Sequence, residues 1–493
     1  MSIKINFRTI LLFCALSLIS FTSFSQKKEV RYEVGTSAQV SSASTLPFWL
    51  VSNKNGIVPD QNSGLLHFKL YSDFNKADSK FDFSYGASII GSQANKSEIF
   101  IDQLYTSLKW RNISADLGLK HRETKYDGLS VTNGDLLFSG NSRSYPELSV
   151  GIKKYTPVPF TNNWLSVKGV FANGVLLDDR YVDKANVHHK NAFLRIGKEK
   201  GVSLSIGLDH YVQWGGESPK WGNMGGLKAF KEAVLVQSAE QAFVDSEGNE
   251  SINDSYNKSG NHLGQNTFEF AYNNDKFLSS LSFKNIYEDK SGDFRHLPDV
   301  KDWNISFYLK FKNQIFISSF IYEYFSSKDQ GGFLIRPDHP IEPRIGFDSY
   351  FNNGIYRSGW TNNQRTIGLP LFSTRIVDGI AQGSDNNAIT AHHFGFKGSV
   401  SGFKYKAMMT FSKNYGTLKL MNDGKGNKQE NYSKGYSFPK ALSQQSFMLE
   451  ISLPKFKKIP FLISTQFALD TGEYLPENLG CQISLTYNGI FSK

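Results

Sequence analysis

The sequence predicts an all-β protein, a transmembrane antiparallel β-barrel of about 18 strands, on three observations. Segments of alternating apolar and polar residues recur along the chain, and the connections between them are short and long in turn. No stretch beyond residue 25 approaches the roughly 18 consecutive apolar residues that a membrane-spanning helix needs. Aromatic residues make up 14% of the chain although its mean hydropathy is −0.36, which is typical of a barrel with a polar lumen and an aromatic outer band.

The amino terminus has the pattern of a secretory signal peptide, residues 1–25. Lys4 and Arg8 precede an apolar run, and small residues lead up to Gln26. Cleavage there leaves 468 of the 493 residues and lowers the formal charge from +10 to +8. Residues 26–493 contain no Pro/Ser-rich linker, so we expect one barrel domain. The modest positive charge fits anionic sugars or lipids, and we expect no nucleic-acid partner.

Alternation and turn residues predict 18 strands, at 32–41, 65–74, 81–90, 99–110, 113–121, 147–155, 164–174, 191–197, 203–214, 266–273, 277–287, 303–311, 315–325, 390–400, 403–413, 446–453, 461–470 and 481–491. The last range is the strictest, with Ile483 and Leu485 on one face and Gln482 and Ser484 on the other. Such a strand alone would equally fit the edge of a soluble sandwich. A soluble propeller would need a motif repeating every ~40–50 residues, and the sequence has none.

The connections give an independent test of the barrel. Long loops are expected at 122–146, 175–190, 215–265, 288–302, 326–389 and 414–445, with tight turns between them. Outer-membrane barrels have short periplasmic turns and long outer loops, and an even strand count, within a range of about 16 to 20, returns both ends to the periplasm. Helical spacing in Leu227–Phe243, and Pro47 within Leu46–Ser52, predict two helices that fill the lumen or cover its mouth.

The richest polar and aromatic cluster lies in the longest loop, at 346–371. Sugar recognition uses flat aromatic faces together with amide, acid or guanidinium groups. The candidate polysaccharide-binding residues are Asp348, Tyr350, Asn352, Asn353, Tyr356, Arg357, Trp360 and Arg365. The tyrosines and the tryptophan are assigned to stacking, the asparagines to sugar hydroxyls and the arginines to anionic groups. The alternative is a loop folded into the lumen and held by its own hydrogen bonds, and both interpretations can hold at once.

Other polar groups suggest no catalysis. In the segment Asp209–Gly216, alternation turns Asp209, Tyr211 and Gln213 toward the lumen, where ordinary lumen polarity explains them. His392 and His393 are strand neighbours that point to opposite sides, and His188-His189 is expected in a loop without an acidic cluster. No Gly-x-Ser-x-Gly element lies convincingly on a strand-to-helix turn, and an exported chain with Cys481 alone cannot form a disulfide or a cysteine zinc site. We therefore expect no enzyme activity, no metal and no cofactor.

Several stretches resemble the Wzi-type capsule assembly proteins. They are Leu46–Trp49 with Asn53 and Gly56; Asn141–Arg143 with Pro146-Glu147; Asp209–Gly216; Asp348–Pro370, reading DSYFNNGIYRSGWTNNQRTIGLP; His392–Gly395; and Asp470–Gly472. The resemblance covers most of the mature chain. It implies a plugged 18-stranded outer-membrane barrel that acts without catalysis as a lectin-like attachment point for capsular polysaccharide.

The function expected on these grounds is attachment of capsular or other exported polysaccharide at the surface of the outer membrane. The expected partners are the polysaccharide, the membrane lipid and the polysaccharide export machinery. The alternative is an outer-membrane porin for small solutes or oligosaccharides, which would need an open lumen. Two loops above 50 residues and two expected helices favour a blocked one. An outer-membrane enzyme is the third option, which the absence of a catalytic constellation disfavours.

Overall fold

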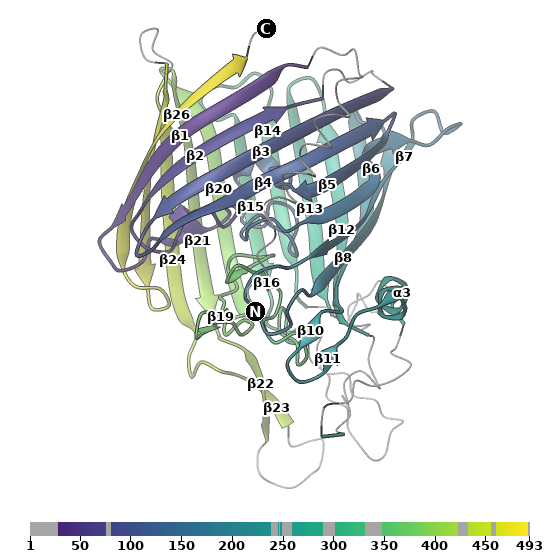
Figure 1. Ribbon diagram of the computed structural model, residues 1–493. Helices are drawn as coiled ribbons and strands as arrows, with labels where there is room; N and C mark the ends of the chain where they lie inside the picture. The colour runs from purple at the N-terminus through teal and green to yellow at the C-terminus, as the bar shows by residue number, and fades with distance from the viewer. Residues whose placement is uncertain are drawn as a thin grey trace.

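The computed structural model describes residues 28–74, 80–237, 245, 247–248, 259–288, 301–330, 348–422, 432–454 and 460–491, so the expected signal peptide lies outside the described residues. One antiparallel sheet of 18 strands dominates the structure (Figure 1). Its strands are β1 (Val30–Ser41), β2 (Ser63–Ser72), β3 (Phe81–Gln93), β4 (Ser97–Trp110), β5 (Ile113–Leu119), β6 (Glu147–Pro157), β7 (Leu165–Val175), β8 (Asn186–Gly197), β9 (Gly201–Trp214), β12 (Asn261–Asn273), β13 (Phe277–Tyr287), β14 (Asn304–Phe311), β15 (Ser319–Ser326), β20 (Ile389–Val400), β21 (Phe403–Asn414), β24 (Leu442–Ser452), β25 (Leu462–Gly472) and β26 (Asn478–Phe491).

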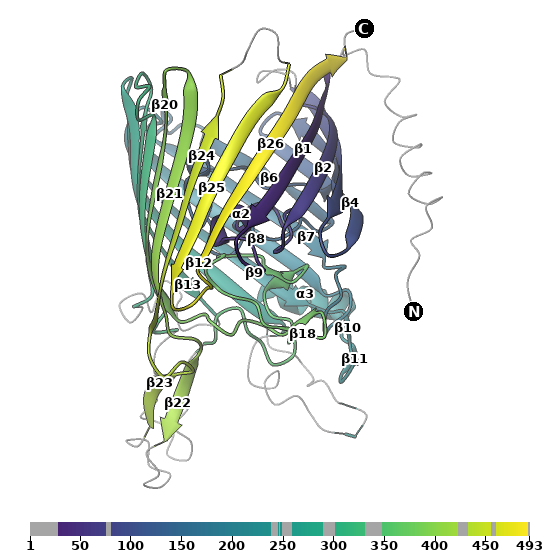
Figure 2. The same cartoon turned by 90° about the vertical axis from the view of Figure 1, so that its left-hand side faces the viewer.

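The sheet closes on itself through its first and last strands. β1 pairs with β2 on one side and with β26 on the other, in a register that runs from Val30↔Phe491 to Ser41↔Gly480. Figure 2 shows β1 and β26 side by side in the wall. Closure gives every strand two neighbours, which satisfies the backbone hydrogen-bonding groups that lipid cannot. The predicted barrel is confirmed, and each of the 18 expected ranges overlaps one observed strand.

Strand ends differ from the predicted ones where pairing continues beyond the alternating pattern. β8 begins at Asn186, five residues before the expected start, because residues 186–190 still pair with β9. The expectation of a loop at His188-His189 was therefore wrong. β15 instead begins at Ser319, four residues late, because residues 315–318 belong to the turn that follows β14. Backbone pairing is set by the neighbouring strand, which local alternation does not report.

The connections divide between the two ends of the barrel as expected. The tight turns lie at the end that carries the start of β1 and the end of β26. The long connections lie at the other end, together with two short ones, 94–96 and 473–477. By the rule for outer-membrane barrels, the turn end is periplasmic and the loop end extracellular. The extracellular connections carry four small hairpins (Figure 1), β10 (Glu217–Ser218) with β11 (Gly222–Asn223), β16 (Thr361–Asn362) with β17 (Arg365–Thr366), β18 (Ile376–Val377) with β19 (Ile380–Ala381), and β22 (Leu418–Asn422) with β23 (Tyr432–Tyr436).

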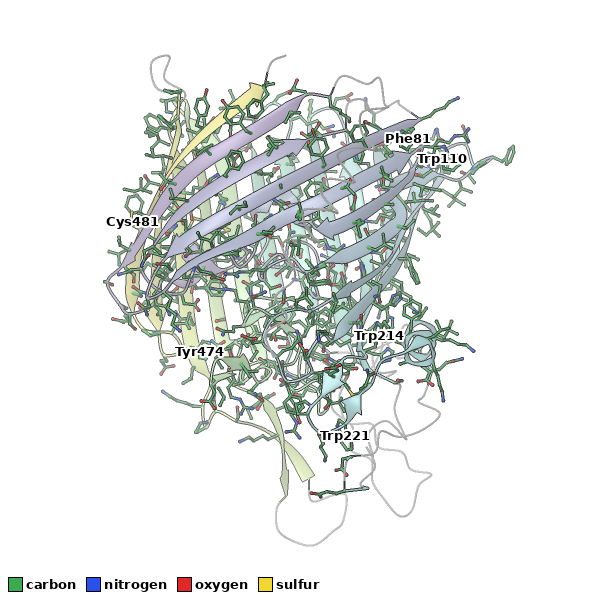
Figure 3. The ribbon with its side chains drawn as sticks, viewed as in Figure 1. Phe81, Trp110, Trp214, Trp221, Tyr474 and Cys481 are labelled. Carbon is green, nitrogen blue, oxygen red and sulfur yellow. The ribbon has the colours of Figure 1, made fainter. Side chains whose placement is uncertain are left out.

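The outer face of the wall is apolar. On β26, Ile483 and Leu485 are exposed on the lipid side, whereas Gly480 contacts Pro47 inside the lumen. This confirms the predicted faces of the last strand. Figure 3 shows Phe81 and Trp110 on the wall near the periplasmic end, and Trp214 and Tyr474 toward the extracellular end. Aromatic side chains at two levels fit the two interfaces of a bilayer.

Both expected helices are present, and they differ in position. α2 (Phe48–Val51) lies inside the lumen with Trp49, Leu50 and Val51 buried, and its first N–H, that of Phe48, donates to Asp470 Oδ2 at 2.8 Å. α3 (Leu227–Leu235) lies at the extracellular rim, where its Phe230 packs on Trp214. It ends before the expected residue 243 because Val236 adopts a left-handed conformation, and residues 238–243 lie outside the described residues. Within the described chain, neither helix has the length and apolarity to cross a membrane.

Three extracellular connections fold back into the lumen and form what we call the plug, residues 42–62, 120–146 and 348–388. Their apolar side chains, including Trp49, Leu137, Phe351 and Trp360, make a hydrophobic core together with lumen-facing residues of the wall. A short 3-10 turn, η2 (Tyr126–Gly128), lies in the second segment.

Polar side chains of the wall hold the plug in place. Glu323 of β15 accepts hydrogen bonds from Ser130 Oγ and Val131 N, at 2.8 and 2.7 Å. Gln265 of β12 accepts one from Leu136 N, at 2.7 Å. These hydrogen bonds use the buried polar groups of Glu323 and Gln265, so the plug is held in one defined position in the barrel.

Candidate functional site: the outer face of the plug

Residues 348–371 connect the separate parts of the plug. Trp360 Nε1 donates to Leu137 O at 2.6 Å, which joins the third segment of the plug to the second. Gln213 of β9 donates to Gly359 O at 3.1 Å, which joins the third segment to the wall. Gly359 has φ +68°, and a Cβ there would lie 2.3 Å from Phe351 O, so only glycine fits this turn. The segment is a structural link as well as a candidate binding loop.

The three aromatic residues assigned to stacking are buried in this link. Tyr350 is 1% exposed, and its hydroxyl lies 3.3 Å from Ile286 O and 3.2 Å from Asp302 Oδ2. The Tyr356 hydroxyl donates to Gly215 O at 3.3 Å. Trp360 is fully buried and meets the Tyr211 ring edge-on. In the described structure none of the three rings presents a free face, so the interpretation of a loop folded into the lumen describes these side chains.

The acid and the two asparagines mainly shape the loop. The Asp348 carboxylate accepts a hydrogen bond from Glu288 N at 3.4 Å. Asn352 exchanges hydrogen bonds with Ser384, through its Nδ2 at 3.0 Å and its Oδ1 at 2.7 Å. Asn353 Oδ1 accepts from the N–H groups of two residues that follow, Ile355 and Tyr356. Asn353 is half-buried, so it stays within reach of a surface ligand.

The two arginines differ in what surrounds them. Arg365 Nη2 lies 2.8 Å from Asp60 Oδ1 and 3.0 Å from Val58 O, so its charge is used to join two segments of the plug. Arg357 is exposed, and its guanidinium lies 4.8 Å from the centroid of the Tyr181 ring. Among the described residues, no carboxylate lies within ion-pair distance of Arg357. Arg357 is therefore available to an anionic ligand.

A second cation lies on a second aromatic ring of the same surface. Lys220 Nζ lies 4.4 Å from the centroid of the Trp221 ring and 3.7 Å from Asp245 Oδ2. The half-buried rings of Tyr181 and Trp221 pack on one small apolar cluster that includes Ile355 and Tyr356. We call Tyr181, Lys220, Trp221 and Arg357 the outer-face cluster. Figure 3 shows Trp221 at the extracellular end.

Sequence reasoning found only Arg357 of this cluster. Tyr181 and Trp221 come from two other connections, so their approach to Arg357 depends on the fold. The available signal was the adjacent pair Lys220-Trp221 in a long loop, a cation beside an aromatic residue. Alternation cannot place it, because the pair lies outside the strands of the wall.

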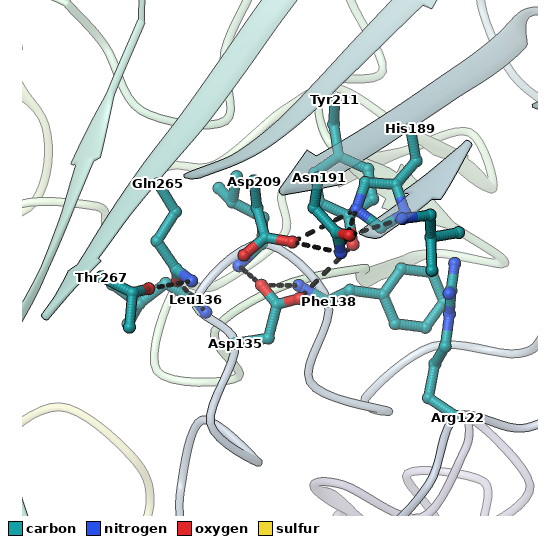
Figure 4. A network of polar contacts seen from close by, with 12 residues as sticks. Arg122, Asp135, Leu136, Phe138, His189, Asn191, Asp209, Tyr211, Gln265 and Thr267 are labelled. Atoms are coloured by element: carbon teal, nitrogen blue, oxygen red, sulfur yellow. Dashed lines mark hydrogen bonds and ion pairs between the residues drawn. The ribbon is translucent and has the colours of Figure 1, made fainter. Parts of the chain in front are cut away.

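The lumen-facing residues of β9 make contacts within the barrel (Figure 4). Asp209 Oδ1 accepts from Asn191 Nδ2 at 2.9 Å and lies 3.3 Å from His189 Nε2. Asp135 of the plug accepts from Leu137 N at 2.9 Å and from the Tyr211 hydroxyl at 3.4 Å. Burial and the neighbouring charge of Asp209 raise the pKa of the Asp135 carboxyl. The prediction that Asp209, Tyr211 and Gln213 face the lumen is confirmed, and the contacts of Tyr211 and Gln213 join plug and wall.

The histidine pairs are separated by the sheet. His189 stacks on Tyr211 at 4.0 Å inside the lumen, whereas His188 packs on Phe171 at 4.6 Å on the other face of β8. His393 lies 2.7 Å from Leu129 O of the plug, and His392 lies outside beside Tyr322. Within the described ranges, no three His, Cys, Asp or Glu side chains are grouped as metal ligands would be.

Comparison with known proteins supports the fold. No protein-family model matches the chain, and no match was found among curated proteins. Wzi of Escherichia coli, described as a carbohydrate-binding β-barrel involved in group 1 capsule assembly, superposes over 97% of this chain and 87% of its own, with a TM-score of 0.51 and 12% identity. OprD of Pseudomonas aeruginosa covers 95% of this chain and 96% of its own, with a TM-score of 0.45 and 10% identity. OccAB2 of Acinetobacter baumannii covers 94% of this chain and 98% of its own, with a TM-score of 0.46 and 9% identity.

At these identities the likeness shows the fold alone. The chain is a bacterial outer-membrane β-barrel. A shared fold does not by itself decide between attachment and transport. The choice depends on the lumen and on the outer face of the plug.

Proposed function

We propose that the chain is a non-enzymatic barrel that binds capsular or other exported polysaccharide at the cell surface. The observation that carries the proposal is the outer-face cluster, in which two cations lie on two aromatic rings on the extracellular side of the core of the plug. Aromatic faces suit the C–H groups of sugar rings, and guanidinium and ammonium groups suit their carboxylates. The description of Wzi as carbohydrate binding agrees with this proposal.

The residues then divide into two roles. Arg357 binds anionic groups of the polymer, and Lys220 stays paired with Asp245 beside the Trp221 ring. Tyr181 and Trp221 contact the sugar rings, and Asn353 bonds the sugar hydroxyls. The remaining residues of the predicted site support this surface from below; they are Asp348, Tyr350, Asn352, Tyr356, Trp360 and Arg365. Binding of the polymer by export machinery on its way to this surface stays a prediction.

The test is binding of an acidic polysaccharide to the purified barrel in detergent, at low and high salt. We expect Arg357→Ala to weaken binding about tenfold, the loss that removal of one charge-assisted hydrogen bond gives. Trp221→Ala should also weaken binding. The control is Arg375→Ala, since Arg375 is an exposed arginine of the same plug whose side chain bonds only Gln382 O among the described residues. Equal binding by the wild type and Arg357→Ala, independent of salt, would move the site elsewhere.

A porin is the second candidate, favoured by a cavity of about 930 Å³ that lies in the lumen beneath the plug. The core of the plug separates this cavity from the outer-face cluster in the described structure. Attachment therefore predicts no stable open conductance in planar bilayers. A steady conductance of nanosiemens order would instead support the porin.

A further inference from the structure

The cavity in the lumen lies on the periplasmic side of the plug. Its wall consists of lumen-facing residues of β5–β9 and β12–β14, and its roof is the plug segment around residues 120–145. It extends to Glu199 and Asn273, beside the tight turns. A volume of about 930 Å³ is enough for a ligand of several rings. Because the plug lies between them, this space and the outer-face cluster are accessible from opposite sides of the membrane.

Four of the eight described lysines and arginines that line the cavity are paired with carboxylates. The ion pairs join Lys120 and Lys153 to Asp116, Arg122 to Glu147, and Lys310 to Asp127. Paired charges of this kind hold the roof and the wall together. They leave little net charge for a ligand.

Lys168 of β7 and Arg195 of β8 are, with Lys125 and Lys284, the lining cations that have no ion pair among the described residues. Lys168 Nζ lies 4.8 Å and Arg195 Cζ 3.7 Å from the centroid of one ring, that of Tyr155. Among the described residues, neither cation has a carboxylate within ion-pair distance. Two cations thus share one aromatic ring at the side of the cavity without a counter-ion from the protein.

The nearby carboxylates are engaged elsewhere. Asp209 contacts His189 and Asn191, as described above. Glu269 accepts from the Tyr126 hydroxyl at 3.3 Å, beneath the roof. Neither acid is therefore free to turn toward Lys168 without breaking one of these contacts.

Strand pairing fixes the two cations side by side. Lys168 pairs with Phe193 and Ser166 pairs with Arg195, so the cations lie on diagonal positions of one face. Tyr155 lies between Ile152 and Thr156, where the register of β6 against β7 shifts. Like charges held on a rigid wall repel each other, and an anion placed between them would relieve that repulsion.

We propose that the periplasmic half of the lumen is a binding site for carboxylate or phosphate groups of a periplasmic ligand, held by Lys168 and Arg195. Both groups offer anionic oxygens to a guanidinium and an ammonium. The volume of the cavity accommodates a short acidic oligosaccharide or a phosphorylated small molecule. This inference does not depend on attachment of polysaccharide at the outer face.

The experiment measures binding of three probes to the full-length barrel in detergent by calorimetry, namely trigalacturonic acid, inorganic phosphate and neutral maltotriose. It is run in the wild type and in an Arg357→Ala background, which reduces the contribution of the outer-face cluster. We expect trigalacturonic acid or phosphate to bind and maltotriose not to bind. Binding of trigalacturonic acid assigns a carboxylate ligand, and binding of inorganic phosphate assigns a phosphate ligand. Binding by neither overturns the proposal.

The variants test which residues hold the anion. Lys168→Gln and Arg195→Gln should each weaken binding about tenfold, with stronger loss in the double variant, and Lys168→Arg should retain it. Lys153→Gln is the matched control, because Lys153 lines the same cavity but is paired with Asp116. Heat-modifiable mobility on gels confirms that each variant is folded. Undiminished binding in the double variant, or equal loss in Lys153→Gln, would contradict the assignment.

Discussion

The wall of the barrel and its plug are built on different principles. A wall residue contacts its partners in the two neighbouring strands, and its outward side chain faces lipid, as with Ile483 and Leu485. The plug has a hydrophobic core like that of a soluble protein, assembled from segments as far apart as Trp49 and Trp360. The wall therefore depends on continuous pairing around a ring, whereas the plug depends on single buried side chains. Variants that disrupt the wall and variants that disrupt the plug should therefore leave different parts of the structure folded.

Removal of residues 481–493 should have the largest effect. The deletion takes away most of β26 and leaves β1 and β25 with unpaired edges. We expect loss of membrane assembly, seen as loss of heat-modifiable mobility in outer-membrane fractions. Cys481→Ser is the control and should assemble normally. A truncated chain that is still soluble, folded and monomeric would show that closure is not what holds the wall.

Trp360→Ala should disrupt the plug and spare the wall. Removing a fully buried tryptophan from a core costs about 3 to 5 kcal/mol. We expect faster hydrogen exchange in residues 120–146 and 348–388, with unchanged heat-modifiable mobility. Trp164→Ala, which removes a tryptophan that is 55% exposed in a periplasmic turn, is the control. If both variants lose the barrel itself, plug and wall form one cooperative unit.

The pH should tune one attachment of the plug. Burial raises the pKa of Asp302 to about 6. Its carboxyl accepts hydrogen bonds from the N–H groups of Asp329 and Gln330 and from the hydroxyl of Tyr350 in the plug. In the unfolded chain the pKa of an aspartate is near 4. The folded state therefore binds the proton more tightly, and this contribution to the free energy of unfolding is lost as the pH rises from about 4 to about 6.

The loss amounts to about 3 kcal/mol by the usual conversion of pKa into free energy. We expect hydrogen exchange in residues 327–330 and 348–351 to accelerate over this range in the wild type. Asp302→Asn, which cannot ionise, should show little pH dependence beyond that of the exchange chemistry. The same acceleration in Asp302→Asn would exclude Asp302 as its cause.

Arg357→Ala should have the smallest effect on stability. Arg357 is exposed and holds no other segment by an ion pair, so the free energy of unfolding of the plug should change by no more than about 0.5 kcal/mol. The same variant should bind polysaccharide about tenfold more weakly. Hydrogen exchange and polysaccharide binding are measured on the same samples, so that the stability of the plug and its affinity for the polymer are compared directly. A destabilised plug would assign Arg357 a supporting role instead.

Much of the wall could be predicted from the sequence because a strand leaves a local trace. Alternation in Phe81–Gln93 or Phe403–Asn414 is visible without any knowledge of the neighbouring strands. The start of β8 at Asn186 could not be found in this way, since that part of the strand is defined by its pairing with β9. Of the candidate site, residue chemistry identified Arg357. It could not distinguish the buried rings of Tyr350 and Trp360 from exposed ones.

The sequence by itself determined the class of protein, the number of strands and the side of the wall that faces lipid, because these follow from a two-residue period and from the spacing of turns. Only the tertiary structure decided that three extracellular segments enter the lumen and bury the predicted aromatic residues. It also brought Tyr181 to Arg357, and Lys168 to Arg195. The physical reason is that these contacts join separate strands and loops, as with Trp360 and Leu137 across 223 residues, and burial at such distances leaves no periodic pattern in the chain.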